Sequence, residues 1–407
     1  MSKNIDIYLK PDFQQLVAKL NAKNSSASFN NNKHIMTYHP DASEALSLTM
    51  PLRNESYTHY DLHPVFQMNL PEGALREALE RATAKQYGSD DLSMLTILGA
   101  NQIGRIVYSS EGQTINLQSS SELQLDDLLN HQDANLFNEL LSRYAKSSGV
   151  AGVQPKVLID IQSHLSLPMD RYIVKSWGDE YPHLGCNEYI CLNIAQQAGL
   201  DVPETFLSDN GKLLISKRFD LDEAGKAMGF EDFCVLQAKG TKQKYDSSIE
   251  QCANTIRHYV SAEHQTTSLA DLYKLTYLNV RIRNGDAHLK NLGIKYQSLT
   301  DYRSHQIPET PRRLAPIYDL VSTVPYIKSD TMALTLTGTK RWPKRKVLHN
   351  FARQHCLLGN KQIDIIEDQV EQAIIDAFPL LEQLQKKHQG FIEVGESMKH
   401  LLRVKQE

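Results

Sequence analysis

The sequence predicts an α+β protein in which a mixed sheet-and-helix N-terminal half precedes a mainly helical C-terminal half. Short runs with strand-like alternation, such as IDIYL near Ile5, recur along the first half, separated by turns and helical stretches. From about residue 250 the pattern changes to long segments with leucine and isoleucine at helical spacing. A chain of 407 residues is also too long for one typical core, so two or three domains are expected.

Composition excludes several classes of protein. Hydrophobic residues make up 41% and charged residues 23%, as in an ordinary globular chain, and the net charge of -4 argues against nucleic-acid binding through the whole surface. No run approaches the roughly 18 apolar residues of a membrane span. The 5 cysteines are scattered without a C-x-x-C pair, which favours neither a zinc site nor a disulfide framework. A reduced cytoplasmic setting is therefore expected.

The N-terminal elements follow in order. Strands are expected at IDIYL, at ALSLTMPL from Ala45, and at the end of a polar loop covering residues 26–38. A helix should run from Pro71, which suits a first turn, to an exit at Gly88. Further mixed elements reach about residue 118, and a helical region then leads to the glycine-containing stretch GVAGVQPK.

The remaining predicted elements carry or flank the candidate site. RYIVKSW reads as a strand, NEYICLNIAQQAGL as a helix that stops at Gly199, and KLLISKRFD as another strand. SLADLYKLTYLNVRIRN should begin a long helix with Ser268 and Asp271 as a capping box. The C-terminal region is helical, with a break or kink at Pro379.

The stretch RNGDAHLKN, residues 283–291, carries the strongest chemical signal. Asp286 and Asn291 are five positions apart, which is the spacing of Asp and Asn in the protein-kinase catalytic loop. An acid can accept the proton of an attacking hydroxyl, while an amide oxygen further along holds a magnesium ion. A polar connection from helix to strand is the plain alternative. A second metal-binding acid should end a later strand, and PIYDLVST supplies Asp319.

The N-terminal half offers matching partners. Lys175 lies in the middle of an apolar strand, where a charge needs pairing, and Glu188 near the start of the next helix is the natural partner. The alternative is an edge strand with Lys175 facing water. GVAGVQPK could cover phosphates with backbone amides, or could be a simple hairpin turn.

With these segments in order, the sequence resembles the HipA-type serine/threonine kinases, the toxins of bacterial toxin–antitoxin pairs. The resemblance rests on ALSLTMPL, VFQMNLPEG, GVQPKVL, EDFC, RNGDAHLKN, PIYDLVST, LTGTKRWP and RQHC and covers almost the whole chain. It implies a protein-kinase-like bilobal fold with an extra N-terminal subdomain. The implied divisions are 1–118 for that subdomain, 119–250 for the N-terminal lobe with the phosphate loop, and 251–407 for the helical catalytic lobe.

The resemblance also implies roles for single residues. Asp286 would be the catalytic base, Lys175 would bind phosphates and pair with Glu188, and Asn291 and Asp319 would hold Mg2+. The ATP-binding set carried over by motif is Ala151, Gly152, Val153, Gln154, Pro155, Lys156, Lys175, Glu231, Asp232, Phe233, His288, Leu289, Lys290, Asn291, Tyr318 and Asp319.

The phosphate loop departs from the family at one point. Family members commonly carry an autophosphorylated serine there, but the corresponding positions are Gly149 and Ala151. Ser147 and Ser148 are the nearest hydroxyls and are candidates for the same modification, which would repel ATP by charge. A polar turn that is never modified is the alternative.

The implied function is an ATP- and magnesium-dependent protein serine/threonine kinase acting as a toxin. Its expected partners are a HipB-like helix-turn-helix antitoxin, DNA through that antitoxin, and a protein substrate such as an aminoacyl-tRNA synthetase. A catalytically silent corepressor and a small-molecule kinase are the rival readings. The basic stretch KRWPKRK, residues 340–346, is either a solvated surface or a patch for an acidic partner.

Overall fold

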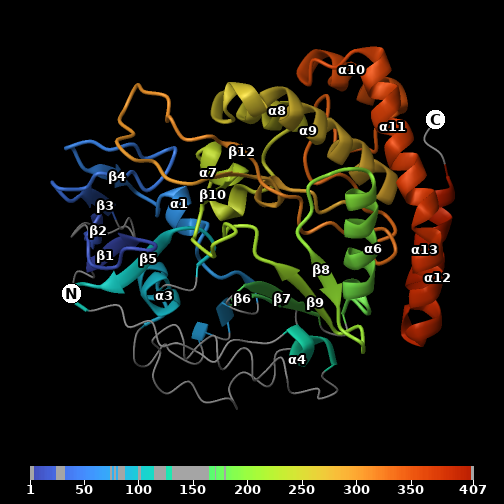
Figure 1. Cartoon of the computed structure of the whole chain (residues 1–407), viewed down its shortest axis with the longest axis horizontal. Coiled ribbons are helices and arrows are strands. Elements are labelled where there is room, and N and C mark those ends of the chain that lie inside the picture. The colour runs from blue at the N-terminus through green and yellow to red at the C-terminus, as the bar shows by residue number, and fades with distance from the viewer. Residues whose placement is uncertain are drawn as a thin grey trace.

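The chain folds as two lobes with an added N-terminal sheet (Figure 1). The structure is a computed structural model that describes residues 4–23, 33–73, 76–77, 79–80, 88–99, 102–113, 125–130, 165–169, 171–177 and 180–404. The α+β class expected from the sequence is confirmed, since sheets dominate the first half and helices the second.

The N-terminal subdomain is built on a five-stranded antiparallel sheet with the order β4-β3-β2-β1-β5. Ile5, Ile7 and Leu9 of β1 belong to the hydrophobic core, which explains the alternation seen in IDIYL. The subdomain strands are β1 (Asn4–Leu9), β2 (Ala18–Lys23), β3 (Lys33–Tyr38), β4 (Tyr57–His59) and β5 (Ile106–Ser110), and its helices are α1 (Pro64–Gln67) and α3 (Asp91–Leu98).

The predicted strand at ALSLTMPL is wrong. Residues 45–52 form isolated bridges only, between Ser47 and Met50 and between Leu52 and Arg303. Apolar side chains of this segment are nevertheless buried, because it packs onto another part of the chain rather than into a ladder. Alternation alone could not separate these two situations.

The predicted helix from Pro71 agrees with the described residues in it. Residues 73, 76–77 and 79–80 are helical. The rest of this segment up to residue 87 lies outside the described residues, and Gly88 has a positive φ of 87°.

A second antiparallel sheet, with the order β6-β7-β9-β8, forms the wall of the N-terminal lobe (Figure 1). The long helix α6 (Leu184–Gln197) packs against β8 and β9, and Gly199 follows its end with a φ of 85°. Because β7 is hydrogen-bonded on both sides, its residue Lys175 does not lie on an edge strand. The strands are β6 (Leu165–Met169), β7 (Tyr172–Ser176), β8 (Thr205–Leu207) and β9 (Leu213–Lys217).

A short three-stranded sheet, β10-β11-β12, connects the two lobes. β10 (Gly229–Asp232) pairs with β11 (Gly293–Tyr296), which lies directly after the candidate catalytic loop. The pairing therefore holds Glu231 and Asp232, which belong to the predicted ATP-binding set, beside the loop, although more than fifty residues separate them. The neighbouring elements are α7 (Phe233–Leu236), η2 (Thr241–Gln243), η3 (Leu289–Asn291) and β12 (Arg313–Leu314).

The C-terminal lobe is helical, as predicted. α11 packs on α6 of the other lobe, and α9 packs on α8, α11 and α13 (Figure 1). None of the described helices is long and apolar enough to cross a membrane. The helices are α8 (Ile249–Tyr259), α9 (Ala262–Ile282), α10 (Arg345–His355), α11 (Asn360–Asp376), α12 (Phe378–Lys387), η4 (Gln389–Phe391) and α13 (Ile392–Arg403), and α4 (Leu125–Asn130) lies earlier in the chain.

One predicted helix start is wrong and one predicted break is confirmed. α9 begins after Ser261, so Ser268 lies inside the helix and is only 3% exposed. A serine and an acid three positions apart also occur within a continuous helix, so their spacing alone does not mark a helix start. Pro379 follows the break between α11 and α12 and occupies the first turn of α12.

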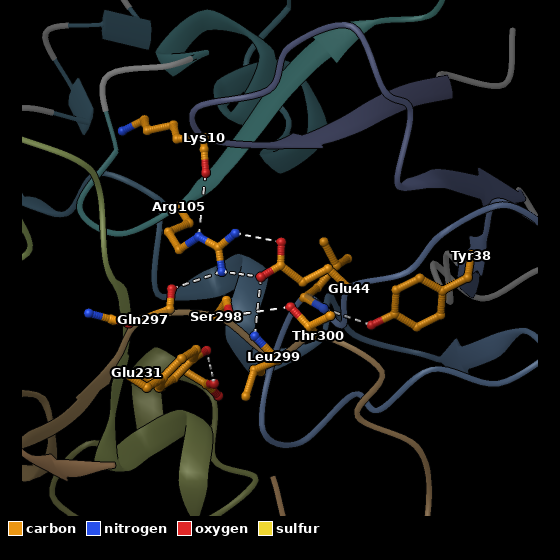
Figure 2. A network of polar contacts seen from close by, with 11 residues as sticks. Lys10, Tyr38, Glu44, Arg105, Glu231, Gln297, Ser298, Leu299 and Thr300 are labelled. Atoms are coloured by element: carbon orange, nitrogen blue, oxygen red, sulfur yellow. Dashed lines mark hydrogen bonds and ion pairs between the residues drawn. The ribbon is translucent and has the colours of Figure 1, made fainter. Parts of the chain in front are cut away.

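Polar contacts attach the N-terminal subdomain to the β10-β11-β12 sheet, here called the hinge sheet (Figure 2). The Arg105 guanidinium donates to both oxygens of Glu44 at 2.6 Å and to the Gln297 carbonyl at 3.0 Å. The Glu231 carboxylate of β10 accepts hydrogen bonds from the Ser47 hydroxyl, the Leu48 amide and the Tyr296 hydroxyl. The segment at residues 45–52 is therefore part of the hinge environment.

Candidate active site

The candidate catalytic loop begins where α9 ends. Arg283 adopts a left-handed conformation with φ of 57°, which ends the helix and turns the chain. The Gly285 amide donates to the Thr323 hydroxyl, and the Asp286 amide donates to the Asn284 side-chain oxygen. A Cβ at Gly285 would lie 2.0 Å from an Asp330 carboxylate oxygen, so a larger residue there would force the Asp330 side chain to move. These contacts fix the backbone that carries Asp286.

Asn291 and Asp319 meet at the floor of the site. The Asn291 amide nitrogen donates to the carbonyl and to the Oδ2 of Asp319, each at 3.1 Å. Asn291 is only 8% exposed, and its Oδ1 has no hydrogen-bond partner among the described residues. An orphaned buried amide oxygen beside a carboxylate is a suitable pair of ligands for Mg2+, which also takes phosphate and water oxygens.

The expectation that Asp319 ends a strand is wrong. β12 stops at Leu314, and Asp319 lies in an irregular segment with a left-handed φ of 58°. Few non-glycine residues adopt this conformation. Such backbone strain is often found at functional sites, where surrounding contacts hold it in place.

Lys175 joins the two lobes. Its ammonium lies 2.6 Å from Glu188 and 2.8 Å from Asp319, so the predicted pair with Glu188 is confirmed and a second carboxylate is added. Burial would lower the pKa of Lys175, but the Asp319 and Glu188 carboxylates raise it above its usual value. Burial raises the pKa of Glu188 to about 7, despite the nearby ammonium. Lys175 therefore connects β7 to α6 and to the segment that carries Asp319.

Lys175, Glu188 and Asp319 line a cleft of about 520 Å³ between the lobes, and Asn291 contacts Asp319 without lining the cleft itself. The volume is within the usual range for small-molecule sites. Apolar walls come from Ile173, Phe219 and Phe230, and the ring of Tyr318 stacks on Phe219 with centroids 5.1 Å apart. The polar lining includes Lys175, Glu188, Asp232, Asp286, His288, Lys290 and Asp319.

The remaining loop residues divide between the cleft and the core. Lys290 pairs with Glu72 at 3.1 Å and with Asp232 at 3.4 Å. These two carboxylates raise the pKa of Lys290 against the opposing effect of burial. Burial lowers the pKa of His288, which keeps the ring neutral at physiological pH. Leu289 is fully buried and does not line the cleft.

Of the two backbone amides of Asp232 and Phe233, only that of Asp232 lies beside the cleft. The Phe233 amide donates to the Leu292 carbonyl, and its side chain is buried in the core. The Asp232 amide donates to the Met68 sulfur at 3.3 Å. Met68 lines the cleft, and sulfur is a weak acceptor. The Asp232 amide is therefore the group of this segment that is open to a better acceptor.

The phosphate-loop candidates lie outside the described residues. They are Ser147, Ser148, Ala151, Gly152, Val153, Gln154, Pro155 and Lys156. Their predicted roles stay predictions.

Two residues at the cleft were missed by sequence reasoning. Glu72 contacts both Lys290 and Lys244, and the Tyr245 hydroxyl donates to the Asp286 carboxylate at 2.7 Å. Glu72 belongs to the motif VFQMNLPEG, which was given no role at the cleft, and Tyr245 belongs to none of the chosen segments. Only the fold brings the two residues to the loop.

Comparisons with known proteins agree with this architecture. A model of the HipA-like C-terminal domain matches residues 148–378, and a model of the HipA N-terminal domain matches residues 13–109. HipA of Shewanella oneidensis MR-1, solved with HipB and its operator DNA, has a TM-score of 0.65 at 18% identity. That superposition covers 98% of this chain and 96% of the other, which establishes the same fold.

Curated relatives include two proteins of Sinorhizobium fredii. "Putative kinase Y4dM" is 31% identical over 303 residues, 68% of this chain and 66% of that protein. "Putative kinase Y4mE" is 29% identical over 306 residues, 69% of each. The chain thus covers about two thirds of the length of these relatives. Since one domain model alone spans more than half of the sequence, the chain belongs to the HipA family.

Proposed function

We propose that this chain is an ATP- and magnesium-dependent protein serine/threonine kinase and the toxin of a toxin–antitoxin pair. The observation that carries the proposal is the chain of contacts from Lys175 through Asp319 to Asn291, beside the cleft that Lys175, Asp286 and Asp319 line. An amine, two acids and an amide at one such cleft match the parts that phosphoryl transfer needs. The relatives named as kinases and the shared fold support the same reading.

The proposed roles follow from the chemistry of each group. Lys175 holds phosphate oxygens, and Glu188 keeps the ammonium in place from α6. Asn291 Oδ1 and the Asp319 carboxylate hold Mg2+, which neutralises negative charge on the phosphates when bound. The Asp232 amide, which donates to the Met68 sulfur in the structure, donates to the adenine when ATP is bound. Asp286 orients the acceptor hydroxyl and takes its proton.

The division of the chain belongs to the same proposal. Residues 1–118 form the N-terminal subdomain, 119–250 the lobe with the phosphate loop, and 251–407 the catalytic lobe. The loop at residues 151–156 covers the ATP phosphates. Ser148 or Ser147 is the candidate autophosphorylation site.

The partners are proposed by relation to the Shewanella complex, which contains HipB and operator DNA. A HipB-like helix-turn-helix antitoxin binds this chain and brings it to DNA. The acceptor is a protein, with an aminoacyl-tRNA synthetase as the leading class. The exposed basic residues Lys340, Arg341 and Lys344 give such a partner a positive surface near the loop, since the Lys340 ammonium lies 5.9 Å from the Tyr245 ring centre.

A lysate experiment tests the proposed activity. The protein is incubated with ATP labelled at the γ-phosphate, Mg2+ and a bacterial lysate, and label is separated into protein and small-molecule fractions. The proposal predicts phosphoserine or phosphothreonine on protein, dependent on Mg2+. Label confined to small molecules would instead indicate a small-molecule kinase. No transfer at all, with a correctly folded protein that still associates with DNA through an antitoxin, would favour the silent corepressor.

A further inference from the structure

A tyrosine from outside the catalytic loop holds the carboxylate of Asp286. The Tyr245 hydroxyl donates to Asp286 Oδ1 at 2.7 Å. Within the described parts of the chain, no other group donates a hydrogen bond to that carboxylate. Tyr245 lies two residues beyond η2 and 41 positions before Asp286, so this contact exists only in the folded protein.

The segment that carries Tyr245 is itself tied to the loop. The Leu289 amide donates to the Lys244 carbonyl at 3.1 Å, which connects the two backbones directly. On its other side, the Thr241 amide donates to the Gln67 side-chain oxygen at 3.0 Å. Tyr245 is therefore held between the N-terminal subdomain and the catalytic loop by contacts that do not involve its own hydroxyl.

The ring of Tyr245 has its own fixed surroundings. It meets the His288 ring edge to face, with centroids 5.2 Å apart and an angle of 72°. The ammonium groups of Lys244 and Lys340 lie 5.5 and 5.9 Å from its centre, within the range of cation–π attraction. A phenylalanine at this position would keep all of these ring contacts. The hydroxyl can therefore be removed without emptying the site.

The Tyr245 hydroxyl remains protonated and donates a hydrogen bond. Burial and the hydrogen bond to Asp286 raise the pKa of Tyr245 above its ordinary value. At neutral pH the group stays protonated and donates to the carboxylate rather than competing for its proton.

We propose that Tyr245 is a positioning residue for phosphoryl transfer, acting through Asp286. A carboxylate rotates easily about its last side-chain bond, so an unheld Asp286 would present either oxygen in many orientations. With Oδ1 bound by Tyr245, Oδ2 is left for the hydroxyl of the acceptor. Correct orientation of this kind lowers the barrier by avoiding unproductive geometries. The inference rests on the proposed kinase function and names a residue that its motifs do not include.

The proposed step transfers the γ-phosphoryl group of ATP to the acceptor hydroxyl. The acceptor oxygen forms a bond to the γ-phosphorus of ATP while the bond from that phosphorus to the ADP oxygen breaks. The acceptor proton passes to Asp286 Oδ2, and ADP leaves with the bonding electron pair. Tyr245 keeps its proton throughout.

The test compares the wild type with Tyr245→Phe in transfer of labelled phosphate to a protein acceptor. Loss of a hydrogen bond to a charged group predicts a fall in kcat of roughly 10- to 100-fold. The dissociation constant of ATP, the KM for acceptor and the melting temperature should stay close to wild type. Tyr57→Phe is the matched control, because it removes a tyrosine hydroxyl bound to the Pro51 carbonyl in the distant subdomain.

Other outcomes would overturn the inference while leaving the kinase function intact. An unchanged kcat would show that the contact is unimportant, and an increased kcat would show that Tyr245 competes with the acceptor for Asp286. Parallel losses of ATP binding and melting temperature would show a structural role. Phosphotyrosine at position 245 would make the residue an acceptor. A wild type without any transfer would instead contradict the proposed function.

Discussion

Lys175 connects the two lobes through ion pairs. Its ammonium is the shared partner of Glu188 and Asp319, and Lys175 and Glu188 are both buried. Residue type alone predicted the first contact, because a lysine inside an apolar strand needs an acid within reach. The second contact depends on the irregular backbone at Asp319, which no local pattern announced.

Replacing Lys175 with methionine should therefore cost stability as well as activity. The change leaves Glu188 without its counter-charge and facing Asp319, and breaking a buried pair costs about 3–5 kcal/mol. Urea unfolding measures this loss. Adding Glu188→Met to the same protein should recover most of the free energy of unfolding but none of the phosphoryl transfer. Equal stability of the single and double variants would contradict the assignment.

Among the elements, α9 and the loop after it were the most predictable parts of the site. The leucine spacing identified the helix, and the order of Asp286 and Asn291 identified the loop, yet the start of α9 was placed too late. The helix gains its position from packing on α8, α11 and α13, and local capping signals do not report such contacts. The strand predicted at residues 45–52 was wrong for the same reason. This segment is buried because it packs on another part of the chain, and not because it pairs within a sheet.

The short helix α1 should show a specific pH dependence. His63 caps it by accepting a hydrogen bond from the Val65 amide, and burial, reinforced by His59, lowers the pKa of His63 to about 3. A lowered folded-state pKa contributes stability above the unfolded value near 6.5, and this is lost as the pH falls toward the folded value.

At pH 5 the wild type should lose about 2 kcal/mol of that contribution relative to pH 7.5. His63→Asn keeps a side-chain cap but cannot titrate, so its free energy of unfolding should change less between the two pH values. Denaturant unfolding of both proteins at pH 5 and 7.5 measures the difference. Identical changes in the two proteins would rule out His63 as the source.

At the scale of the whole molecule, the N-terminal subdomain is joined to the hinge by buried polar contacts. Arg105 and Glu44 make a bidentate ion pair (Figure 2). The Glu231 carboxylate of β10 accepts hydrogen bonds from Ser47 and Leu48. The sequence predicted the separate subdomain but not this attachment, because partners between 61 and 184 positions apart carry no mutual signal in one sequence.

Arg105→Met should lower the free energy of unfolding by about 3 kcal/mol, since it leaves Glu44 partly buried without its cation. The exposed pair of Lys387 and Asp209 is the control, and Lys387→Met should cost clearly less. Chemical denaturation of the wild type and the two variants gives the comparison. A smaller effect for Arg105→Met than for Lys387→Met would contradict a buried attachment.

The central claim is that Asp286 performs the acceptor chemistry of one ATP site built from both lobes. It is tested most directly by measuring γ-phosphate transfer and ATP affinity together for the wild type and Asp286→Asn. The account predicts transfer by the wild type, a loss of at least about a hundredfold in the variant, and ATP binding that is retained in both. Full transfer by Asp286→Asn would contradict it.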